Sequence, residues 1–206
     1  MFWADALYIM TAFFSVAILT GMGIYAFRHR DVPGAVSFGC IMFSVPFWIT
    51  AKTVIFLNPG NEEVFFFWVR FRAASMAITP VAWLAFSLEY SGRRKLISLR
   101  NVFILSAVPC VSILLCFTSD FHSLFFQNQG YDWGIWGWVH SSYSFFLMFT
   151  GMAIMAITAV RSIDLYRRQS MAIIIVSPEG YWFCFVVIPL SGNDAKEWIR
   201  ERPFVA

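Results

Sequence analysis

The sequence predicts an all-α fold, a polytopic transmembrane helical bundle with five clear spans and an irregular sixth. Of the 206 residues, 59% are hydrophobic and only 13% are charged, whereas a soluble domain carries about 25% charged residues. Apolar stretches of roughly 20 residues recur along the chain, and this length suffices to cross a hydrocarbon core of about 30 Å. These observations indicate a protein that crosses the lipid bilayer several times.

The first predicted span covers about residues 6–27. It lacks the basic start and the cleavage site of a secretory signal peptide, so we expect it to remain in the mature protein. The second span covers about residues 33–57 and begins at Pro33, and the turn signal NPGN follows it at 58–61. The third and fourth spans are predicted at about 64–88 and 101–118.

A polar and aromatic loop at 119–143 separates the fourth span from the fifth, which is predicted at about 144–160. A further apolar stretch at 171–190 is interrupted by SPEG and predicts an irregular sixth span. We therefore divide the chain into a transmembrane bundle at 1–175 and an atypical region at 176–206. The aromatic residues near the loop predict an interfacial belt, although they could also line a ligand pocket: Phe125, Phe126, Tyr131, Trp133, Trp136, Trp138 and Tyr143.

The loop charges predict the orientation of the bundle. Turns after the first, third and fifth spans carry the basic residues, whereas turns after the second and fourth spans carry only acidic ones. Short loops rich in lysine and arginine stay in the cytoplasm, so the N-terminus is predicted to lie outside. The basic residues are Arg28, Arg30, Arg93, Arg94, Lys95, Arg100, Arg161, Arg167 and Arg168, and the acidic ones are Glu62, Glu63, Asp120 and Asp132.

Three cations lie inside the predicted spans, and an intramembrane charge needs a partner or a function. Lys52, Arg70 and Arg72 all fall within roughly the outer 12 Å of the bilayer at 1.5 Å per residue. They could reach toward the headgroups and pair with the acidic residues of the outer turns. They could instead line an outer cavity for an anionic ligand. Because Arg70 and Arg72 point about 200° apart on a helix, only one of them can face such a cavity.

The remaining polar residues indicate no catalysis and no cofactor. Glu89 and Arg93 have the spacing of a local ion pair. His122 and His140 flank the outer loop, but their spacing matches no metal-binding motif. The chain carries none of the motifs of a serine hydrolase, a zinc protease or a nucleotide-binding loop. Its cations are confined to short turns, which is not typical of a nucleic-acid partner, and the Gly-Met-Gly at 21–23 is interpreted as a packing notch.

Two stretches of the chain carry distinctive patterns. The stretch ITPVAWLAFSLEYSGR follows the pattern P-x-x-W-L-x-F-x-L-x-Y-[ST]-G-R, and AVPCVSILLCFTSDFHSLFF follows a second pattern in which Ser119 replaces the usual asparagine. With these patterns the chain resembles the seven-transmembrane N-terminal sensor region of bacterial and archaeal histidine kinases. Trp48 and the stretch DLYRRQSMAIII also fit. The residues that match the two patterns are Pro80, Trp83, Phe86, Glu89, Tyr90, Gly92 and Arg93, then Pro109, Thr118, His122 and Leu124.

The resemblance covers about residues 5–175 and implies a domain that perceives a signal and passes it to cytoplasmic kinase or signalling domains. It also implies an outside N-terminus, and a homodimer is a candidate assembly. After about residue 175 the chain is expected to depart from the family, with no seventh span and no kinase part. Two other classes stay open. Prolines within the spans (Pro46, Pro80 and Pro109) could break helices as in a small transporter or channel, and a membrane enzyme is the third reading.

We expect the stimulus to enter at the outer ends of the second to fifth spans. Trp48, Lys52, one of Arg70 or Arg72, and His122 fall at similar heights there. A cation at this depth should face protein or water rather than lipid, and pockets between bundle helices are common ligand sites. The sequence therefore predicts an outer cavity that binds a small anionic molecule or another membrane signal.

The predicted orientation can be tested by cysteine accessibility. A cysteine at Gly60 should react with a membrane-impermeant thiol reagent in intact cells, whereas a cysteine at Ser91 should react only after the cells are permeabilised. The unaltered chain is the control, because its four cysteines all lie in apolar stretches. The reverse labelling pattern would overturn the charge argument.

Overall fold

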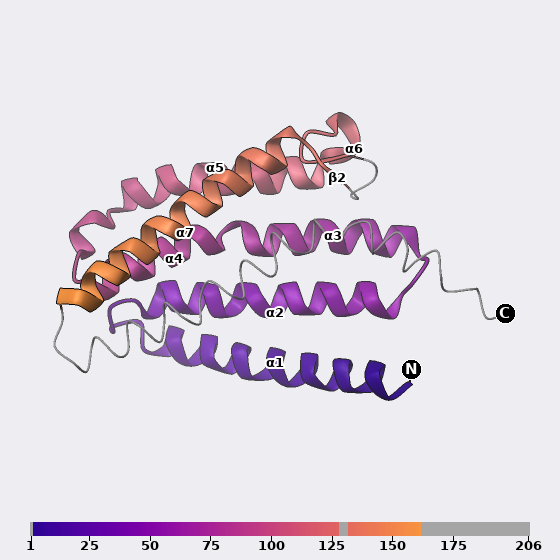
Figure 1. The fold of residues 1–206 in the computed structure, drawn as a ribbon, viewed down its shortest axis with the longest axis horizontal. Helices are drawn as coiled ribbons and strands as arrows, with labels where there is room; N and C mark the ends of the chain where they lie inside the picture. The colour runs from indigo at the N-terminus through magenta and orange to yellow at the C-terminus, as the bar shows by residue number, and fades with distance from the viewer. Residues whose placement is uncertain (1, 128–131, 162–206) are drawn as a thin grey trace.

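The computed structural model describes residues 2–127 and 132–161. These residues contain five helices or helix pairs that are long and apolar enough to cross a membrane, and they lie side by side in an elongated bundle (Figure 1). The predicted irregular sixth span at 171–190 and the region 176–206 lie outside the described residues. The spans are α1 (Phe2–Arg28), α2 (Ala35–Leu57), α3 (Glu62–Ala77) with α4 (Thr79–Tyr90), α5 (Leu99–Phe117) and α7 (Ile135–Arg161).

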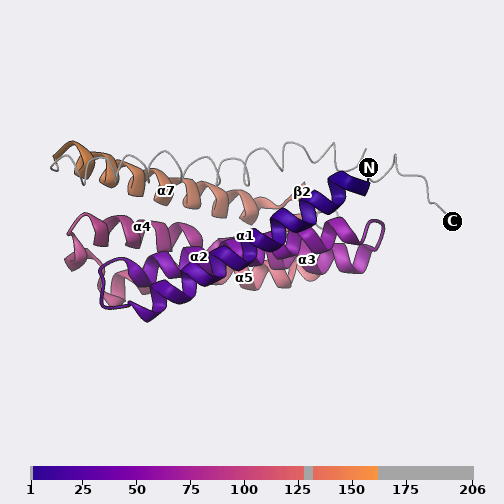
Figure 2. The ribbon, with the colours of Figure 1, turned by 90° about the horizontal axis from the view of Figure 1, so that it is seen from below.

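The helices pack mainly against their neighbours in the chain. α1 contacts α2, α2 contacts both α3 and α4, and α3 contacts α5, while α7 returns to pack on α4 and α5. Figure 2 shows α7 along one side of the bundle, with α4 beneath it. The third span is the central one, because half of its apolar window is buried against 11% to 33% for the other four spans.

Turn chemistry places the helix ends a few residues from their predicted positions. The second span begins at Ala35 rather than at Pro33, because Gly34 adopts a left-handed conformation with φ of 88°. The third span begins at Glu62 rather than at 64, because the Asn61 side chain accepts a hydrogen bond from the Val64 amide at 3.1 Å. This cap satisfies one of the amides that a helix N-terminus leaves without an intrahelical partner.

The third span, predicted as one helix at 64–88, is broken at Ile78 into α3 and α4. Pro80 lies in the first turn of α4 and has no amide hydrogen to continue the helical ladder from Met76. At the break the Thr79 hydroxyl donates to Ser44 Oγ on α2 at 2.9 Å, and both side chains are buried. In contrast, Pro46 and Pro109 lie inside the continuous helices α2 and α5.

The loop predicted at 119–143 is much shorter, because the fifth span begins at residue 135 instead of 144. It contains the short helix α6 (Ser119–His122) and a hairpin of β1 (Phe126–Gln127) and β2 (Asp132–Trp133). The predicted aromatic belt is wrong for Phe125 and Phe126, which are only 2% and 7% exposed and belong to the core. Trp138 is 64% exposed, as a belt residue would be, and Tyr131 lies outside the described residues.

Reciprocal contacts between glycines and phenylalanines join α1 to α2. The Phe43 ring lies over Gly23, where an added Cβ would approach within 2.8 Å, and the Phe27 ring lies over Gly39, where it would approach within 3.0 Å. The interpretation of the Gly-Met-Gly segment as a packing notch holds for Gly23. At Gly21 an added Cβ would meet no atom within 4 Å.

A tryptophan–glycine contact joins α4 to α7. The Trp83 indole donates from Nε1 to the carbonyl of Met148 at 3.2 Å and is 5% exposed. It lies directly over Gly151, where an added Cβ would come within 2.5 Å of Nε1 and within 3.0 Å of Ser87 Oγ. This close approach is open only to glycine.

We expect Gly151→Ala to lower the thermal unfolding temperature in detergent, because overpacking a filled site costs about 1–3 kcal/mol. Gly21→Ala is the matched control. It makes the same change inside a helix but in open space, and alanine is the better helix former by about 0.5–1 kcal/mol. Circular dichroism during heating measures both. Equal stability of the two variants would show that the Trp83 contact is not tight.

Candidate functional site

The end of the bundle at which α6 lies carries a polar cluster built from α3, α5 and α6. Arg70 of α3 binds Asp120 of α6 through both terminal nitrogens of its guanidinium group: Nη1 donates to Oδ2 at 2.9 Å, and Nη2 donates to Oδ1. The Arg70 side chain is 19% exposed and that of Asp120 is 63% exposed. Bidentate pairs of this kind hold a fixed geometry, but the exposed carboxylate leaves the pair open to water and to solutes.

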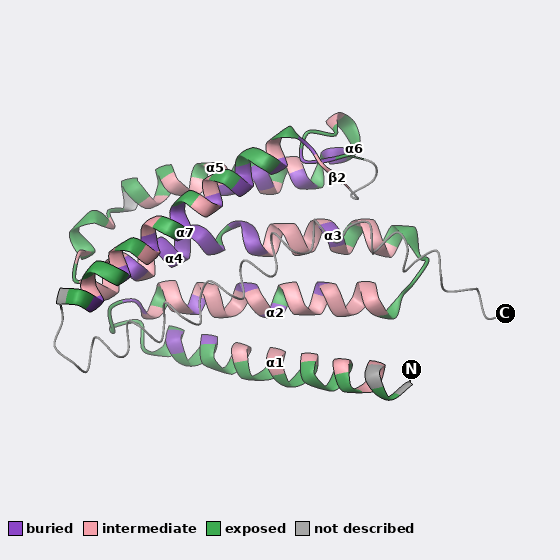
Figure 3. Ribbon diagram, viewed as in Figure 1, coloured by how far each residue is buried: buried purple, intermediate pink, exposed green. Residues whose placement is uncertain are grey.

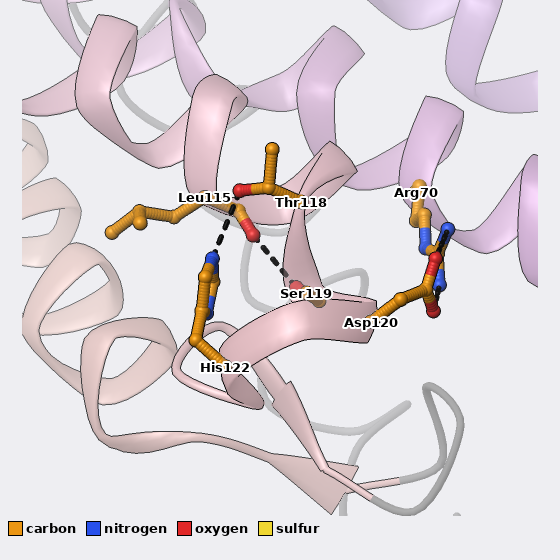
Figure 4. A network of polar contacts seen from close by, with 6 residues as sticks. All are labelled: Arg70, Leu115, Thr118, Ser119, Asp120 and His122. Atoms are coloured by element: carbon orange, nitrogen blue, oxygen red, sulfur yellow. Dashed lines mark hydrogen bonds and ion pairs between the residues drawn. The ribbon is translucent and has the colours of Figure 1, made fainter.

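Two hydroxyls attach α6 to the last turn of α5. Thr118 Oγ1 donates to the Leu114 carbonyl at 2.8 Å, and Ser119 Oγ donates to the Leu115 carbonyl at 2.7 Å. The Leu114 carbonyl also accepts from the Thr118 amide at 3.1 Å, and the Leu115 carbonyl gains a side-chain partner in the last turn of α5, where intrahelical partners run out. Asp120 is thereby presented toward Arg70 (Figure 4).

The hydrogen bonds of His122 define its tautomer. The Leu124 amide donates to Nδ1 at 3.1 Å, so Nδ1 must be the unprotonated acceptor. Nε2 then carries the hydrogen and donates to Thr118 Oγ1 at 2.9 Å. Figure 4 shows this contact and the Arg70–Asp120 pair on different sides of α6. The structure therefore places Arg70 of α3 beside α6, the short helix that contains His122, although Arg70 and His122 do not bind each other.

The other predicted site residues lie on α2 and α3. The Lys52 ammonium is 5.4 Å from the centroid of the Trp48 ring, within range of a cation–π interaction. Trp48 is half-buried and packs against the core cluster of Met76, Trp83 and Met148. Arg72 is half-buried on α3.

A buried polar network between α5 and α7 was missed from the sequence, where His140 was assigned to the outer loop. His140 is 1% exposed, and its Nδ1 lies 2.9 Å from Ser112 Oγ. Trp136 Nε1 donates to the same hydroxyl at 2.9 Å, and Ser144 Oγ lies 3.4 Å from His140 Nε2. Trp136, His140 and Ser144 recur every four residues, so they share one face of a helix, and this spacing was the available signal.

The predicted ion pair between Glu89 and Arg93 is wrong. The Ser37 hydroxyl of α2 donates to Glu89 Oε2 at 2.9 Å, so this carboxylate joins α4 to α2 instead of supporting its own helix. Within the described residues, no group of three or more His, Cys, Asp or Glu side chains is arranged to hold a metal ion.

Several residues of the two sequence patterns have structural roles around α4. Phe86 lies between the rings of Trp83 and Tyr90, with centroid distances of 6.1 and 5.9 Å. Phe86 also covers Gly34, where an added Cβ would approach its ring within 3.2 Å. Gly92 ends α4 with φ of 73°, and the Arg93 amide then donates to the Leu88 carbonyl at 2.9 Å. Such left-handed caps close many helices.

The fold and its apolar helices define a multi-pass membrane protein built as a helical bundle. A family model described as the N-terminal 7TM region of histidine kinase matches residues 11–193. The chain belongs to this family, as the sequence patterns predicted, and the match continues past residue 175, where a departure was expected. No curated protein matches the chain, and no solved structure matches it.

We expect Ser112→Ala to destabilise the bundle by about 1–3 kcal/mol, because the buried Trp136 and His140 ring nitrogens would each lose a partner. Ser15→Ala is the control, since the Ser15 hydroxyl bonds only to the Thr11 carbonyl of its own helix. Thermal unfolding in detergent compares the two variants. If both are as stable as the unaltered chain, the network contributes nothing to the packing of α5 on α7.

Proposed function

We propose that this chain is the signal-perceiving membrane domain of a histidine-kinase system and that it performs no catalysis itself. The basic turns after α1 and α4 lie at one end of the bundle, and the acidic turn, α6 and the hairpin lie at the other (Figure 1). The charge asymmetry supports a cytoplasmic basic end and an N-terminus outside the cell. The end with α6 would then face the stimulus.

The proposed stimulus site centres on Arg70. Its guanidinium already holds a carboxylate in a bidentate pair, and that carboxylate is exposed. A small anionic ligand could replace Asp120 at the same nitrogens, because carboxylates and phosphates share this geometry. Lys52, with Trp48 beside it, and His122 complete the proposed site at the outer ends of α2 to α5. Arg72 points about 200° away from Arg70 on α3 and lies outside this site.

The break at Ile78 is the observation that carries the proposal. On its outer side, α3 is bound to α6 through the Arg70–Asp120 pair. On its inner side, α4 is bound to α7 through the Trp83 indole and the Met148 carbonyl. The two halves of one span are thus attached to different partners and join at Ile78, which keeps helical dihedral angles while Pro80 interrupts the helical hydrogen bonds. A change at α6 could tilt α3 and, through α4, shift α7.

α7 is the natural output element of this arrangement. It is the last described helix, and its C-terminal end lies with the basic turns after α1 and α4, at the end that we propose to be cytoplasmic (Figure 1). Energetic coupling between two distant sites requires a segment with two conformations, and each site must favour one of these conformations. Here the segment is the third span, and the two sites are the outer cluster and the α4–α7 contact.

Hydrogen–deuterium exchange on the purified full chain tests this route. We expect Asp120→Asn, which weakens the pair with Arg70, to change the exchange of amides around Met148 and Gly151 in α7 as well as that of α3. Glu62→Gln is the control, because it removes a carboxylate from the same end of the bundle without touching that pair. A change confined to α3 and α6 would contradict transmission through α4.

A further inference from the structure

The connector between α4 and α5 concentrates positive charge. It carries Arg93, Arg94 and Lys95, and Arg100 follows in the first turn of α5. The sequence contains no Asp or Glu from residue 90 to residue 119, and the preceding Glu89 binds Ser37. In the described part of the chain, no carboxylate lies within 4.0 Å of these four cations.

The connector holds these cations on an ordered backbone. It leaves α4 through the left-handed Gly92, after which the Arg93 amide donates to the Leu88 carbonyl at 2.9 Å. The Asn101 side chain donates back to the Leu96 carbonyl at 2.9 Å. Because these carbonyls have partners inside the protein, this segment can lie against a membrane interface without losing hydrogen bonds to water.

An exposed apolar face of α5 begins directly after Arg100. Phe103 is 83% exposed and Ile104 is 61% exposed, and Leu114 continues the same side of the helix at 67%. Spacings of three and four residues place these side chains on one face with Arg100, and exposed residues recur along α5 in Figure 3. At 1.5 Å per residue, Phe103 lies about one turn deeper than Arg100. Leu96, among the cations, is 55% exposed.

We propose that this end of α5 binds an acidic phospholipid. Lys95, Arg94 and Arg100 bind the phosphodiester and its anionic headgroup, and an acyl chain lies along Phe103 and Ile104. Cations next to a membrane attract acidic lipids, and each contributes roughly 1 kcal/mol. The apolar face that continues from Arg100 selects a lipid over a soluble phosphate, because a soluble ligand would leave the Phe103 and Ile104 side chains uncovered.

Native mass spectrometry of the full chain in detergent tests the proposal with dioleoyl phosphatidylglycerol and dioleoyl phosphatidylcholine as probes. We expect the unaltered chain to prefer phosphatidylglycerol. The double variant Lys95→Gln/Arg100→Gln should lower that preference by about 25-fold, from about fivefold for each of the two cations. Phe103→Ala should weaken both lipids alike, because it removes only acyl-chain contact.

The matched control is Arg28→Gln/Arg30→Gln, which removes two cations from the turn after α1, where Asp31 already offsets part of the charge. It should keep the preference for phosphatidylglycerol. An equal loss in both double variants would overturn the proposal, because the binding would then follow net charge alone. Saturation of the site by glycerol phosphate would also overturn it in favour of a soluble anion.

A charge-retaining variant guards against a folding defect. Lys95→Arg/Arg100→Lys keeps both cations and should retain the preference for phosphatidylglycerol, whether or not the glutamine variant folds. Thermal unfolding in phosphatidylcholine alone compares the folding of all variants. Loss of the preference in this variant, with normal unfolding, would contradict recognition by charge.

Discussion

The Trp83 indole occupies the point at which α2, α4 and α7 meet, and the arrangement of the bundle depends on it. Its ring belongs to a buried cluster with Met76 and Met148, against which Trp48 of α2 packs, and its nitrogen donates to a backbone carbonyl of α7. The glycine beneath it allows α7 to approach closely. In lipid, helices gain little from apolar contact alone, so close approach and buried hydrogen bonds determine which faces meet.

The same constraint explains the other polar contacts between helices. The hydroxyl pair of Ser44 and Thr79 joins α2 to the broken third span, and the Ser112 hydroxyl and His140 join α5 to α7. Each contact supplies a partner to a polar group that would otherwise face hydrocarbon. These few directional bonds position the helices against one another, and the surrounding apolar packing fills the space between them.

The break in the third span separates a half that contacts α6 from a half that contacts α7. Its first half, α3, carries the exposed ion pair of Arg70 and Asp120, whose carboxylate is open to solutes. Its second half, α4, packs against α2 and α7. An accessible ion pair at one end and a buried, specific contact at the other suit the proposed conversion of a surface event into a shift of packed helices.

The sequence by itself determined the membrane class, the five spans and the family, because hydrophobic length and the two patterns around α4 and α5 are local properties. It also offered Asp120 among the partners of the intramembrane cations. Only the tertiary structure decided that Glu89 binds Ser37, that Phe125 and Phe126 are core residues, and that His140 is buried beside Ser112. Each of these outcomes depends on which side chains a neighbouring helix presents, and tertiary packing sets the rotation and depth of that helix. The residues next to Glu89, Phe125 or His140 in the sequence do not specify this neighbour.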